Sequence, residues 1–521
     1  MTTPSEALAA VKAARRLRDD AARPVAVARQ HALGKLTARE RIATLLDDGA
    51  VFEELGALVE PGRHTMDTGD LQAPGDGVVT GLGQVLGRTT AIAAFDFTIL
   101  GGSNGEHGEW KMLRLLDLCL RHGHPLVMLL DGGGHRIQEG LDSRHFARGT
   151  TLFQRFCDLS GWVPMVAAMM GPGFAGPSNF AALADFVVMV EGTSTMGIAG
   201  PALVAAATGE RLTKDDLGSA EVQATGAGIA DLAVVDDRAA LAAVRRFLSF
   251  LPANAGQPAP VLPTDDPADR RDAALASLIP DNPRRAYDMR KAVTAIADAG
   301  STFELRPTHA RNLLTVLARM DGRPVGIIAN QPMQMGGTLT VPACEKGAHF
   351  VALCDAFGIP LIYLIDVPGF LVGPAAETSG LARRSGRLLF ELGQATVPRL
   401  SVVLRKGYGL AYIAMAGGRS FDADLCLAWP SAEICAMSVE GAVDVAYRKQ
   451  IDGTDDPAQA RDGLIARFRT QLGPLRAAEA HGVDDIIDPC DTRPALIRAL
   501  ARCPGRRARA VSGRFRAISP I

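Results

Sequence analysis

The stretch "GHPLVMLLDGGG" at residues 123–134 recurs as "GIPLIYLIDVPG" at residues 358–369, 235 positions further along the chain. At the same offset, "GRTTAIAAF" at 87–95 matches "GRPVGIIAN" at 322–330. All four stretches carry apolar runs, and those of the first pair end in a glycine-containing segment. A constant offset over such a length predicts a tandem duplication of units of roughly 200 residues.

Each copy alternates short apolar runs with helical patterns. "PLVMLLD" (125–131) and "PMVAAMM" (164–170) are typical of buried strands, whereas "KMLRLLDLCLRH" (111–122) and "RHFARGTTLFQRFCDLSG" (144–161) are typical of helices. Continuous apolar strands separated by helices predict an α/β fold with a largely parallel sheet. Residues 251–283, rich in Pro, Asp and Ala, are typical of a linker between the copies.

The composition is that of an ordinary globular protein. Of the 521 residues, 47% are hydrophobic and 21% charged, and the formal net charge is −2. This balance predicts no basic surface for nucleic acid, and apolar runs such as "IPLIYLI" are too short to cross a membrane. The N-terminal segment is a charged helical pattern without the apolar centre of a signal peptide. We therefore expect a soluble, cytoplasmic protein that binds neither nucleic acid nor membrane.

The eight cysteines form no C-x-x-C pair, and several lie inside apolar segments. This placement predicts buried, reduced thiols rather than disulfides or a zinc site. The sequence also contains no His-x-x-x-His or H-E-x-x-H cluster. We therefore expect no metal site.

A glycine-rich turn stands at an equivalent place in each copy. "VPMVAAMMGPGFAG" (163–176) matches "VPRLSVVLRKGYGL" (397–410) at an offset of 234, so "GPGFAGP" (171–177) corresponds to "KGYGLAY" (406–412). Neither turn contains an acid or a histidine. Such turns suit paired oxyanion holes, in which backbone N–H groups meet negative charge on a substrate oxygen. They are equally typical of tight structural turns between a strand and a helix.

Longer motifs resemble a known family, the carboxyltransferase (β) subunit of biotin-dependent acyl-CoA carboxylases of the propionyl-CoA carboxylase type. The matching stretches run from about residue 30 almost to the end of the chain. They are "GKLTARERIATLLDDGAVFEE" (34–54), "FDFTILGGSNGEHG" (95–108), "DGGGHRIQEG" (131–140), "MGPGFAG" (170–176), "KGAHFVALCDAFGIPLIYLIDVPGFLVG" (346–373), "AWPSAEICAM" (428–437) and "GVDDIIDPCDTRPALIRAL" (482–500).

The resemblance implies two tandem crotonase-like domains, each a ββα superhelix. They would be acyl-CoA carboxyltransferase domains spanning residues 1–257 and 266–521. It also implies that the carboxyl group comes from biotin on a partner, the biotin carboxylase/biotin carboxyl carrier subunit, and passes to the α-carbon of an acyl-CoA. Negative charge would then develop on the biotin urea oxygen and on the thioester oxygen. A homo-hexamer, with each site between the N-domain of one chain and the C-domain of another, is expected from the same resemblance.

Carried over to this sequence, the family's oxyanion positions fall on both turns. The resemblance implies that the amides of Ala175 and Gly176 face the thioester oxygen and those of Leu410 and Ala411 face the biotin urea oxygen. Further substrate contacts are expected at neighbouring positions: Gly173, Phe174, Tyr408, Gly409, Tyr412 and Ile413. Coenzyme A contacts are expected within residues 308–341.

The sequence departs from the family pattern in both turns. The first usually reads Gly-Gly-Ala, but here it is Ala175-Gly176-Pro177, and proline has no N–H to donate. The second usually reads Gly-Gly-Ala-Tyr, but here Leu410 replaces the second glycine. Leucine at this position would be strained if a positive φ were required.

Two pairs of charged residues occupy equivalent places in the copies. Asp131 and Asp366 end equivalent strands, and we expect them to cap the following turn rather than to act as acids or bases. Lys111 and Lys346 occupy equivalent helix positions, and we expect solvated charges there.

Three functions stay open at this stage. The chain has neither a biotinyl "A/V-M-K-M" motif nor an ATP-binding glycine loop, so a carboxyltransferase would depend on a separate biotinylated partner. The substrate would be propionyl-CoA, acetyl-CoA, or a methylcrotonyl-like or longer acyl-CoA, with the first two favoured. The alternatives are a carboxyacyl-CoA decarboxylase or transcarboxylase subunit, and a non-catalytic acyl-CoA-binding paralogue.

Overall fold

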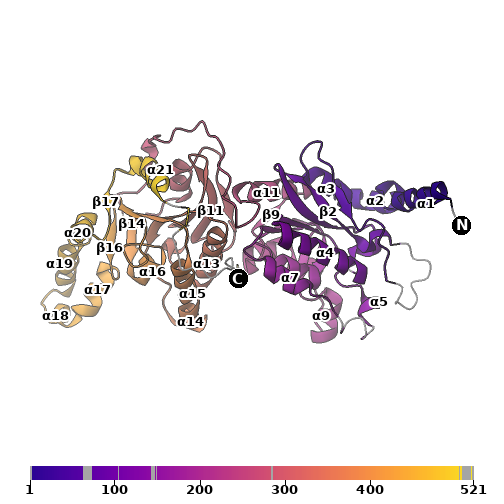
Figure 1. Ribbon diagram of the computed structural model, residues 1–521. Helices are drawn as coiled ribbons and strands as arrows, with labels where there is room; N and C mark the ends of the chain where they lie inside the picture. The colour runs from indigo at the N-terminus through magenta and orange to yellow at the C-terminus, as the bar shows by residue number, and fades with distance from the viewer. Residues whose placement is uncertain are drawn as a thin grey trace. The chain divides into compact units, whose positions relative to one another are not determined.

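The chain is described by a computed structural model (Figure 1). The described residues are 3–62, 73–103, 105–141, 143, 147, 149–282, 285–503, 505–506 and 518. Two compact units follow one another, and the division falls between Gln257 and Pro258. Among the described residues no helix is both long and apolar enough to span a membrane.

The first unit is built on a mixed sheet that, within the described residues, has seven strands in the order β1-β2-β3-β4-β5-β7-β9. These strands are β1 (Glu53–Leu55), β2 (Val78–Val85), β3 (Arg88–Phe95), β4 (Leu126–Leu130), β5 (Met165–Met169), β7 (Phe186–Val190) and β9 (Leu232–Val234). A small parallel pair stands apart from this sheet and consists of β6 (Pro172–Phe174) and β8 (Thr195–Gly197).

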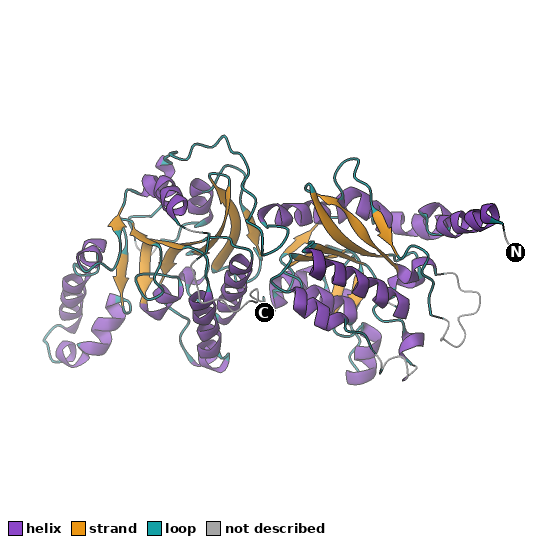
Figure 2. Cartoon of the chain, in the orientation of Figure 1, coloured by secondary structure: helices purple, strands orange, loops and turns teal. Residues whose placement is uncertain are grey.

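The first unit has helices on both faces of its sheet, and its N-terminal helix extends away from the sheet (Figure 2). They are α1 (Pro4–Arg16), α2 (Pro24–Ala32), α3 (Ala38–Leu45), α4 (Glu106–His122), α5 (Ile137–Gly140), α7 (Leu152–Leu159), α8 (Gly176–Ala182), α9 (Pro201–Thr208), α10 (Lys214–Gly218) and α11 (Asp237–Phe250). Shorter helical turns are η1 (Asp20–Ala22), η2 (Pro74–Gly77), η3 (Leu100–Gly102) and the π-type η4 (Val222–Ala227). Helix α4 packs on β2 and β3, whereas α11 packs on β5 and β7.

The second unit repeats this plan. Its described strands follow the order β10-β11-β12-β13-β14-β15-β17, and β16 also pairs with β14. The strands are β10 (Phe303–Leu305), β11 (Leu313–Met320), β12 (Arg323–Asn330), β13 (Leu361–Val367), β14 (Arg399–Tyr408), β15 (Leu425–Ala428), β16 (Glu433–Cys435) and β17 (Asp485–Ile486). Its helices and helical turns are η5 (Ala273–Leu275), α12 (Arg290–Ile296), η6 (Met335–Gly337), α13 (Val341–Ala356), α14 (Pro374–Thr378), α15 (Leu381–Gln394), α16 (Gly409–Ala414), α17 (Val439–Ala446), α18 (Arg448–Asp452), α19 (Pro457–Arg469), α20 (Pro474–Glu479), η7 (Pro489–Asp491) and α21 (Thr492–Arg502).

Strand register confirms the predicted duplication. Strands β3 and β4 are parallel with Ala91 opposite Leu126, and β12 and β13 are parallel with Gly326 opposite Leu361. Both members of the second pair lie 235 positions after those of the first, as the sequence offset predicts. Every residue of β4, β5 and β13 is buried, as expected for parallel strands covered on both faces.

Two predicted helices have different bounds in the structure. Helix α4 begins at Glu106, five residues before the predicted start, and ends before Gly123, whose φ of 69° closes the helix in the left-handed conformation. Helix α7 spans only Leu152–Leu159 of the predicted 144–161. Residues 144–146 and 148 of that prediction lie outside the described residues.

In both units, aspartate side chains accept hydrogen bonds at the starts of parallel strands. Each accepts a hydrogen bond from a backbone N–H on the neighbouring strand: Asp185 from Met165 at 2.8 Å, Asp231 from Val187 at 2.8 Å, Asp424 from Arg399 at 2.8 Å and Asp484 from Cys426 at 2.7 Å. These bonds hold the amino ends of the strands in register, so the same device supports the sheet in each copy.

Candidate active site

The first glycine-rich turn joins β6 to α8. Ala175 has φ 59° and ψ −113°, and its N–H donates to the carbonyl of Gly197 at 2.9 Å. That amide is therefore already used within the fold. Within the described part of the chain, no group accepts a hydrogen bond from the N–H of Gly176, and Pro177 has no N–H. The turn thus offers the amide of Gly176 at the start of a helix, where backbone donors favour negative charge.

A serine in α8 holds this first turn in shape. The Ser178 hydroxyl donates to the carbonyl of Gly173 at 2.5 Å and accepts the N–H of Gly197 at 2.8 Å. The Phe174 side chain between them is almost fully buried. A Cβ on Gly173 would lie 2.3 Å from the terminal methyl of Met169, so a larger residue there would require the Met169 side chain to move.

The second turn joins β14 directly to α16. Gly409 has φ 64°, whereas Leu410 keeps a negative φ and exposes 52% of its surface. No group among the described residues accepts a hydrogen bond from the N–H of Leu410 or of Ala411. The second turn therefore offers two adjacent amide donors to an external oxygen.

The positive φ shows how the two turns correspond. Ala175 and Gly409 share this conformation and lie 234 positions apart. Leu410 therefore matches Gly176, and Ala411 matches Pro177. Leu410 is not strained, because the residue with positive φ in the second turn is Gly409. In the first turn the residue with positive φ is Ala175, which is therefore strained.

The remaining predicted contact residues of the second turn differ in exposure. The Tyr408 hydroxyl donates to Glu433 at 2.6 Å, and the pKa of this buried phenol is raised by burial and by that bond. The Tyr412 ring packs on Gly407 and on Gly417, where a Cβ would lie only 2.0 Å from the ring. Both rings thus support the turn; Tyr408 is buried, whereas Tyr412 and Ile413 are half-buried.

Asp131, after β4, is fully buried and bound by two cations that the sequence patterns did not indicate. Its carboxylate accepts from the Lys35 ammonium and from the Arg41 guanidinium, each at 2.8 Å. Arg41 also donates to Asp237 at 2.7 Å and to the carbonyl of Met170 at 3.3 Å.

Asp366, its equivalent in the second unit, obtains its cation locally. It accepts from the Arg405 guanidinium at 3.0 Å and from the backbone N–H of Lys406 at 3.1 Å. Arg405 also donates to the carbonyl of Arg285 at 2.9 Å. The prediction that both aspartates cap the turn after their own strand is wrong: Asp131 is bound by two side-chain cations, and Asp366 by Arg405 and by the N–H of Lys406 in β14.

The prediction of solvated charges at Lys111 and Lys346 is wrong. Both side chains are buried, and their ammonium groups donate to backbone carbonyls. The acceptors are Gly75 and Val78 for Lys111, and Arg306, His309 and Leu313 for Lys346. Burial lowers the pKa of Lys111 to about 8. The helix pattern failed because it does not reveal which loop crosses the helix.

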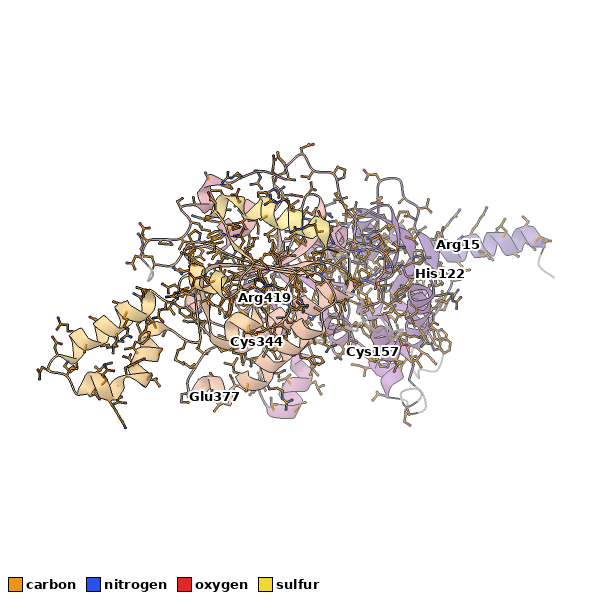
Figure 3. All side chains as sticks on the ribbon, turned by 60° about the vertical axis from the view of Figure 1, so that its left-hand side comes forward. Arg15, His122, Cys157, Cys344, Glu377 and Arg419 are labelled. Carbon is orange, nitrogen blue, oxygen red and sulfur yellow. The ribbon has the colours of Figure 1, made fainter. Side chains whose placement is uncertain are left out.

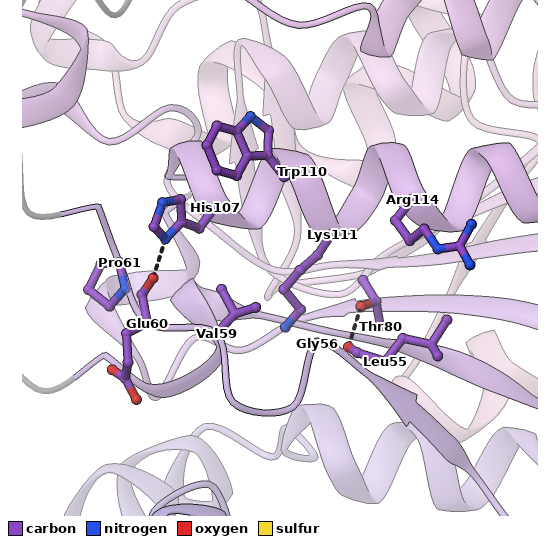
Figure 4. Close-up of a pocket in the computed structure, with 10 residues that line it drawn as sticks. All are labelled: Leu55, Gly56, Val59, Glu60, Pro61, Thr80, His107, Trp110, Lys111 and Arg114. Atoms are coloured by element: carbon purple, nitrogen blue, oxygen red, sulfur yellow. Dashed lines mark hydrogen bonds between the residues drawn. The ribbon is translucent and has the colours of Figure 1, made fainter.

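A separate cavity of about 670 Å³ lies beside Lys111, between β1, β2 and α4 (Figure 4). Trp110 and Arg114 line it from α4, and the ring of His107 hydrogen-bonds the carbonyl of Glu60. None of the predicted site residues lines this cavity. The Lys111 ammonium at its floor is already bound to carbonyls, so we do not assign the chemistry of the turns to it.

Of the described cysteines, all have free thiols and no disulfide forms. Cys344 is buried, whereas Cys157 is exposed (Figure 3). The prediction of buried thiols therefore holds for Cys119, Cys344, Cys354 and Cys426 and fails for Cys157, which lies on the outer face of α7. The described residues contain no cluster of three or more His, Cys, Asp or Glu that could hold a metal ion.

Each of the two units thus presents at least one backbone amide without an acceptor among the described residues at the start of a helix, an arrangement that suits an enzyme site for negative charge on a substrate oxygen. The family model "Carboxyl transferase domain" matches residues 29–512, and the chain belongs to this family. The predictions of the family and of the fold class are thereby confirmed.

Similar proteins agree with this assignment. The propionyl-CoA carboxylase carboxyltransferase subunit of Haloferax mediterranei is 41% identical over 92% of this chain and 93% of its own length. The methylmalonyl-CoA decarboxylase subunit alpha of Veillonella parvula is 40% identical over 92% of both chains. The crystal structure of transcarboxylase 12S with methylmalonyl-coenzyme A bound covers 99% of both chains, with a TM-score of 0.91 and 38% identity.

Proposed function

We propose that this chain is the carboxyltransferase component of a biotin-dependent acyl-CoA carboxylase. It moves a carboxyl group from carboxybiotin on a partner subunit to the α-carbon of a short acyl-CoA, with propionyl-CoA or acetyl-CoA favoured. The observation that carries the proposal is the pair of turns whose backbone amides lack internal acceptors. Chemistry that places negative charge on two oxygens needs such donors more than it needs side-chain acids.

The donor set fits both reacting groups. The N–H groups of Leu410 and Ala411 would hold the urea oxygen of biotin, which supplies the carboxyl group when bound. The N–H of Gly176 would hold the thioester oxygen of the acyl-CoA. Each donor already has its direction fixed by a strand and a helix, so little reorganisation is needed when charge develops. One amide donor of this kind is worth roughly 3 kcal/mol in the transition state.

The two turns differ in donor strength under this proposal. Because Pro177 replaces the residue equivalent to Ala411, the first turn contributes one amide and the second contributes two. The Ala175 amide, expected from the resemblance to be a donor, is bound to Gly197. We therefore assign the thioester oxygen to Gly176 alone among the amides of this turn.

The direction of transfer and the assembly belong to the same proposal. The relative named a methylmalonyl-CoA decarboxylase is about as similar as the carboxylase relative, so decarboxylation of a carboxyacyl-CoA at the same site is the alternative. The transcarboxylase 12S structure is described as a hexamer assembly. We propose a cytoplasmic homo-hexamer that works with a biotin carboxylase/biotin carboxyl carrier subunit.

A reconstituted assay tests this proposal. The purified chain is combined with a biotinylated carrier and its carboxylase, ATP and labelled bicarbonate, and acetyl-, propionyl-, methylcrotonyl- and longer acyl-CoA are compared. We expect label in a short acyl-CoA only when both components are present, and avidin should abolish it. Fixation by the chain without biotinylated protein would contradict the division of labour. Loss of carboxyl from methylmalonyl-CoA without net fixation would favour the decarboxylase alternative.

A further inference from the structure

The buried carboxylates of the two strand-end aspartates, Asp131 and Asp366, are paired with cations from different parts of the chain. Arg405 follows the core of β14 and supplies the cation for Asp366. The residue at the same place in the first copy is Gly171, which has no side chain. A Cβ there would lie 1.8 Å from Oδ1 of Asp131 and 2.7 Å from Nζ of Lys35. The Asp131 carboxylate thus occupies the space in which an arginine side chain would begin, and its cations must come from elsewhere.

The missing cations come from the segment 35–41, inside the motif "GKLTARER". Thr37 and Glu40 form a reciprocal capping box that fixes the first turn of α3. Arg41, one residue later, is 1% exposed and contacts both Asp131 and the carbonyl of Met170. Met170 lies directly before the turn "GPGFAGP". A segment about 130 residues distant in sequence therefore binds the chain where it enters the turn.

The second unit binds its chain near the corresponding place, two residues closer to its turn. Asp366 accepts the backbone N–H of Lys406, two residues before Tyr408. Arg405 ties that carboxylate to the carbonyl of Arg285. In the first unit Arg41 thus binds the backbone six residues before Gly176, and in the second unit Asp366 binds the backbone four residues before Leu410.

Stability alone does not account for such clusters. Removing two charges from water costs much of what their attraction returns, and apolar groups of the same volume are often equally stable. What a buried, directional ion pair supplies is a defined geometry. Displacing reacting groups by about 1 Å can cost roughly 100-fold in rate.

We propose that Lys35 and Arg41 in the first unit, and Arg405 in the second, are positioning residues that act through Asp131 and Asp366 to set the two glycine-rich turns. The inference rests on the proposed function for its kinetic consequences but not for its structural ones. It also assigns a role to the "GKLTARER" motif, which provides the cations that Gly171 cannot.

The test compares two neutralised pairs in the full-length protein. One variant carries Arg41→Gln with Asp131→Asn, and the other carries Arg405→Gln with Asp366→Asn. A matched control carries Arg461→Gln with Asp444→Asn, which removes an exposed pair joined at 2.6 Å. Hydrogen–deuterium exchange is followed in peptides covering 171–178 and 406–412, alongside Tm and the kcat and KM of carboxyl transfer.

We expect each buried neutralisation to raise exchange about tenfold in its own turn and to leave the other turn unchanged. We expect kcat to fall by about 10- to 100-fold, with KM for acyl-CoA nearly constant in the Arg405→Gln pair. The control should change neither. Wild-type exchange and kcat in the buried variants, or equal loosening of both turns with a lowered Tm, would overturn the proposal.

Two further comparisons test the positioning role if a variant does not fold or if the protein transfers no carboxyl group. If a neutralised variant does not fold, Arg405→Lys and Arg41→Lys retain the charge but not the geometry of the forked guanidinium. They should fold and still loosen the adjacent turn, and wild-type exchange in both would again overturn the proposal. If the unmodified protein transfers no carboxyl group to any acyl-CoA, the proposed function fails, while the exchange comparison still decides the positioning role.

Discussion

Ala175 adopts a backbone conformation that is far easier for glycine. At φ 59° and ψ −113° its methyl group crowds the neighbouring carbonyl, whereas the equivalent Gly409 avoids this contact. The hydrogen bond from the Ala175 N–H to the Gly197 carbonyl, and the hydrogen bond from the Gly197 N–H to the Ser178 hydroxyl, hold Ala175 in this conformation. The strained residue directly precedes Gly176, whose N–H is the proposed donor. The backbone strain at Ala175 therefore lies next to the group that the proposed site uses.

We expect Ala175→Gly to stabilise the protein by on the order of 1 kcal/mol, because relief of strain exceeds the added entropy of the unfolded chain. The measurement is the midpoint of thermal unfolding. Leu183→Gly, in a helical conformation that ends α8, is the matched control and should destabilise instead. A lower midpoint for Ala175→Gly would show that the contacts of the alanine methyl stabilise the protein by more than the backbone strain destabilises it.

Ala411→Pro tests whether the second turn donates backbone amides to substrate, and it places there a residue that the first turn already contains at the equivalent position. Proline already occupies the equivalent place in the first turn, at Pro177, so this position of the turn accepts it. The change removes one amide donor, and we expect transfer to fall by on the order of 10² to 10³. The assay is carboxyl transfer at saturating acyl-CoA, with acyl-CoA binding expected to be unchanged.

The reciprocal change, Pro177→Ala, adds an amide to the first turn. It should leave oligomerisation intact and lower the KM or raise the kcat for acyl-CoA. If Ala411→Pro assembles normally and transfers at the unmodified rate, the second turn is only a structural turn.

At the scale of elements, Asp185, one of the aspartates that bind strand starts, makes stability depend on pH. Burial raises the pKa of Asp185 to about 8 from an ordinary value near 3.8. The folded state therefore holds a proton that the unfolded state releases between these two values. The contribution of Asp185 to stability is greatest below about pH 4 and is lost as the pH rises to about 8.

Asp185→Asn should flatten this dependence. Asparagine keeps an oxygen for the Met165 N–H but does not titrate, so the difference in Tm between variant and wild type should grow in favour of the variant from pH 5 to pH 8. Asp424→Asn, at an exposed strand start that makes the same bond, is the control. A difference in Tm that is constant with pH would show that Asp185 does not titrate in this range.

At the scale of the whole molecule, the proposed site combines the first unit of one chain with the second unit of another. Gly176→Pro removes the donor of the first turn, and Ala411→Pro removes a donor of the second. Co-expression of the two variants with different tags gives mixed oligomers. If sites form between chains, one site of each mixed dimer regains both intact turns.

Random mixing should then restore about a quarter of wild-type activity from two inactive parents. Carboxyl transfer by the mixed preparation is compared with each parent, and light scattering checks that all three are hexamers. No recovery in properly assembled mixtures would place both turns of a site in one chain. A fully active monomer would contradict the proposed assembly altogether.

The duplication, the α/β class and the two turns could be predicted from sequence because they are properties of residue order. Apolar runs such as 126–130 and 361–365 mark buried parallel strands whatever surrounds them. A shared offset then relates one copy to the other. Family motifs added the crotonase-like fold and the carboxyl transfer chemistry, which no spacing by itself identifies.

Only the tertiary structure decided which groups meet at the turns. Lys35 and Arg41 bind Asp131 across about 90 residues, and no local pattern relates positions so distant. The burial of Lys111 and the use of the Ala175 amide by Gly197 depend likewise on segments that cross in space. The order of residues thus determined the strands, helices and turns, whereas the partner of each buried charge and amide was settled by packing, because a charge or amide removed from water must find its partner wherever the fold brings one.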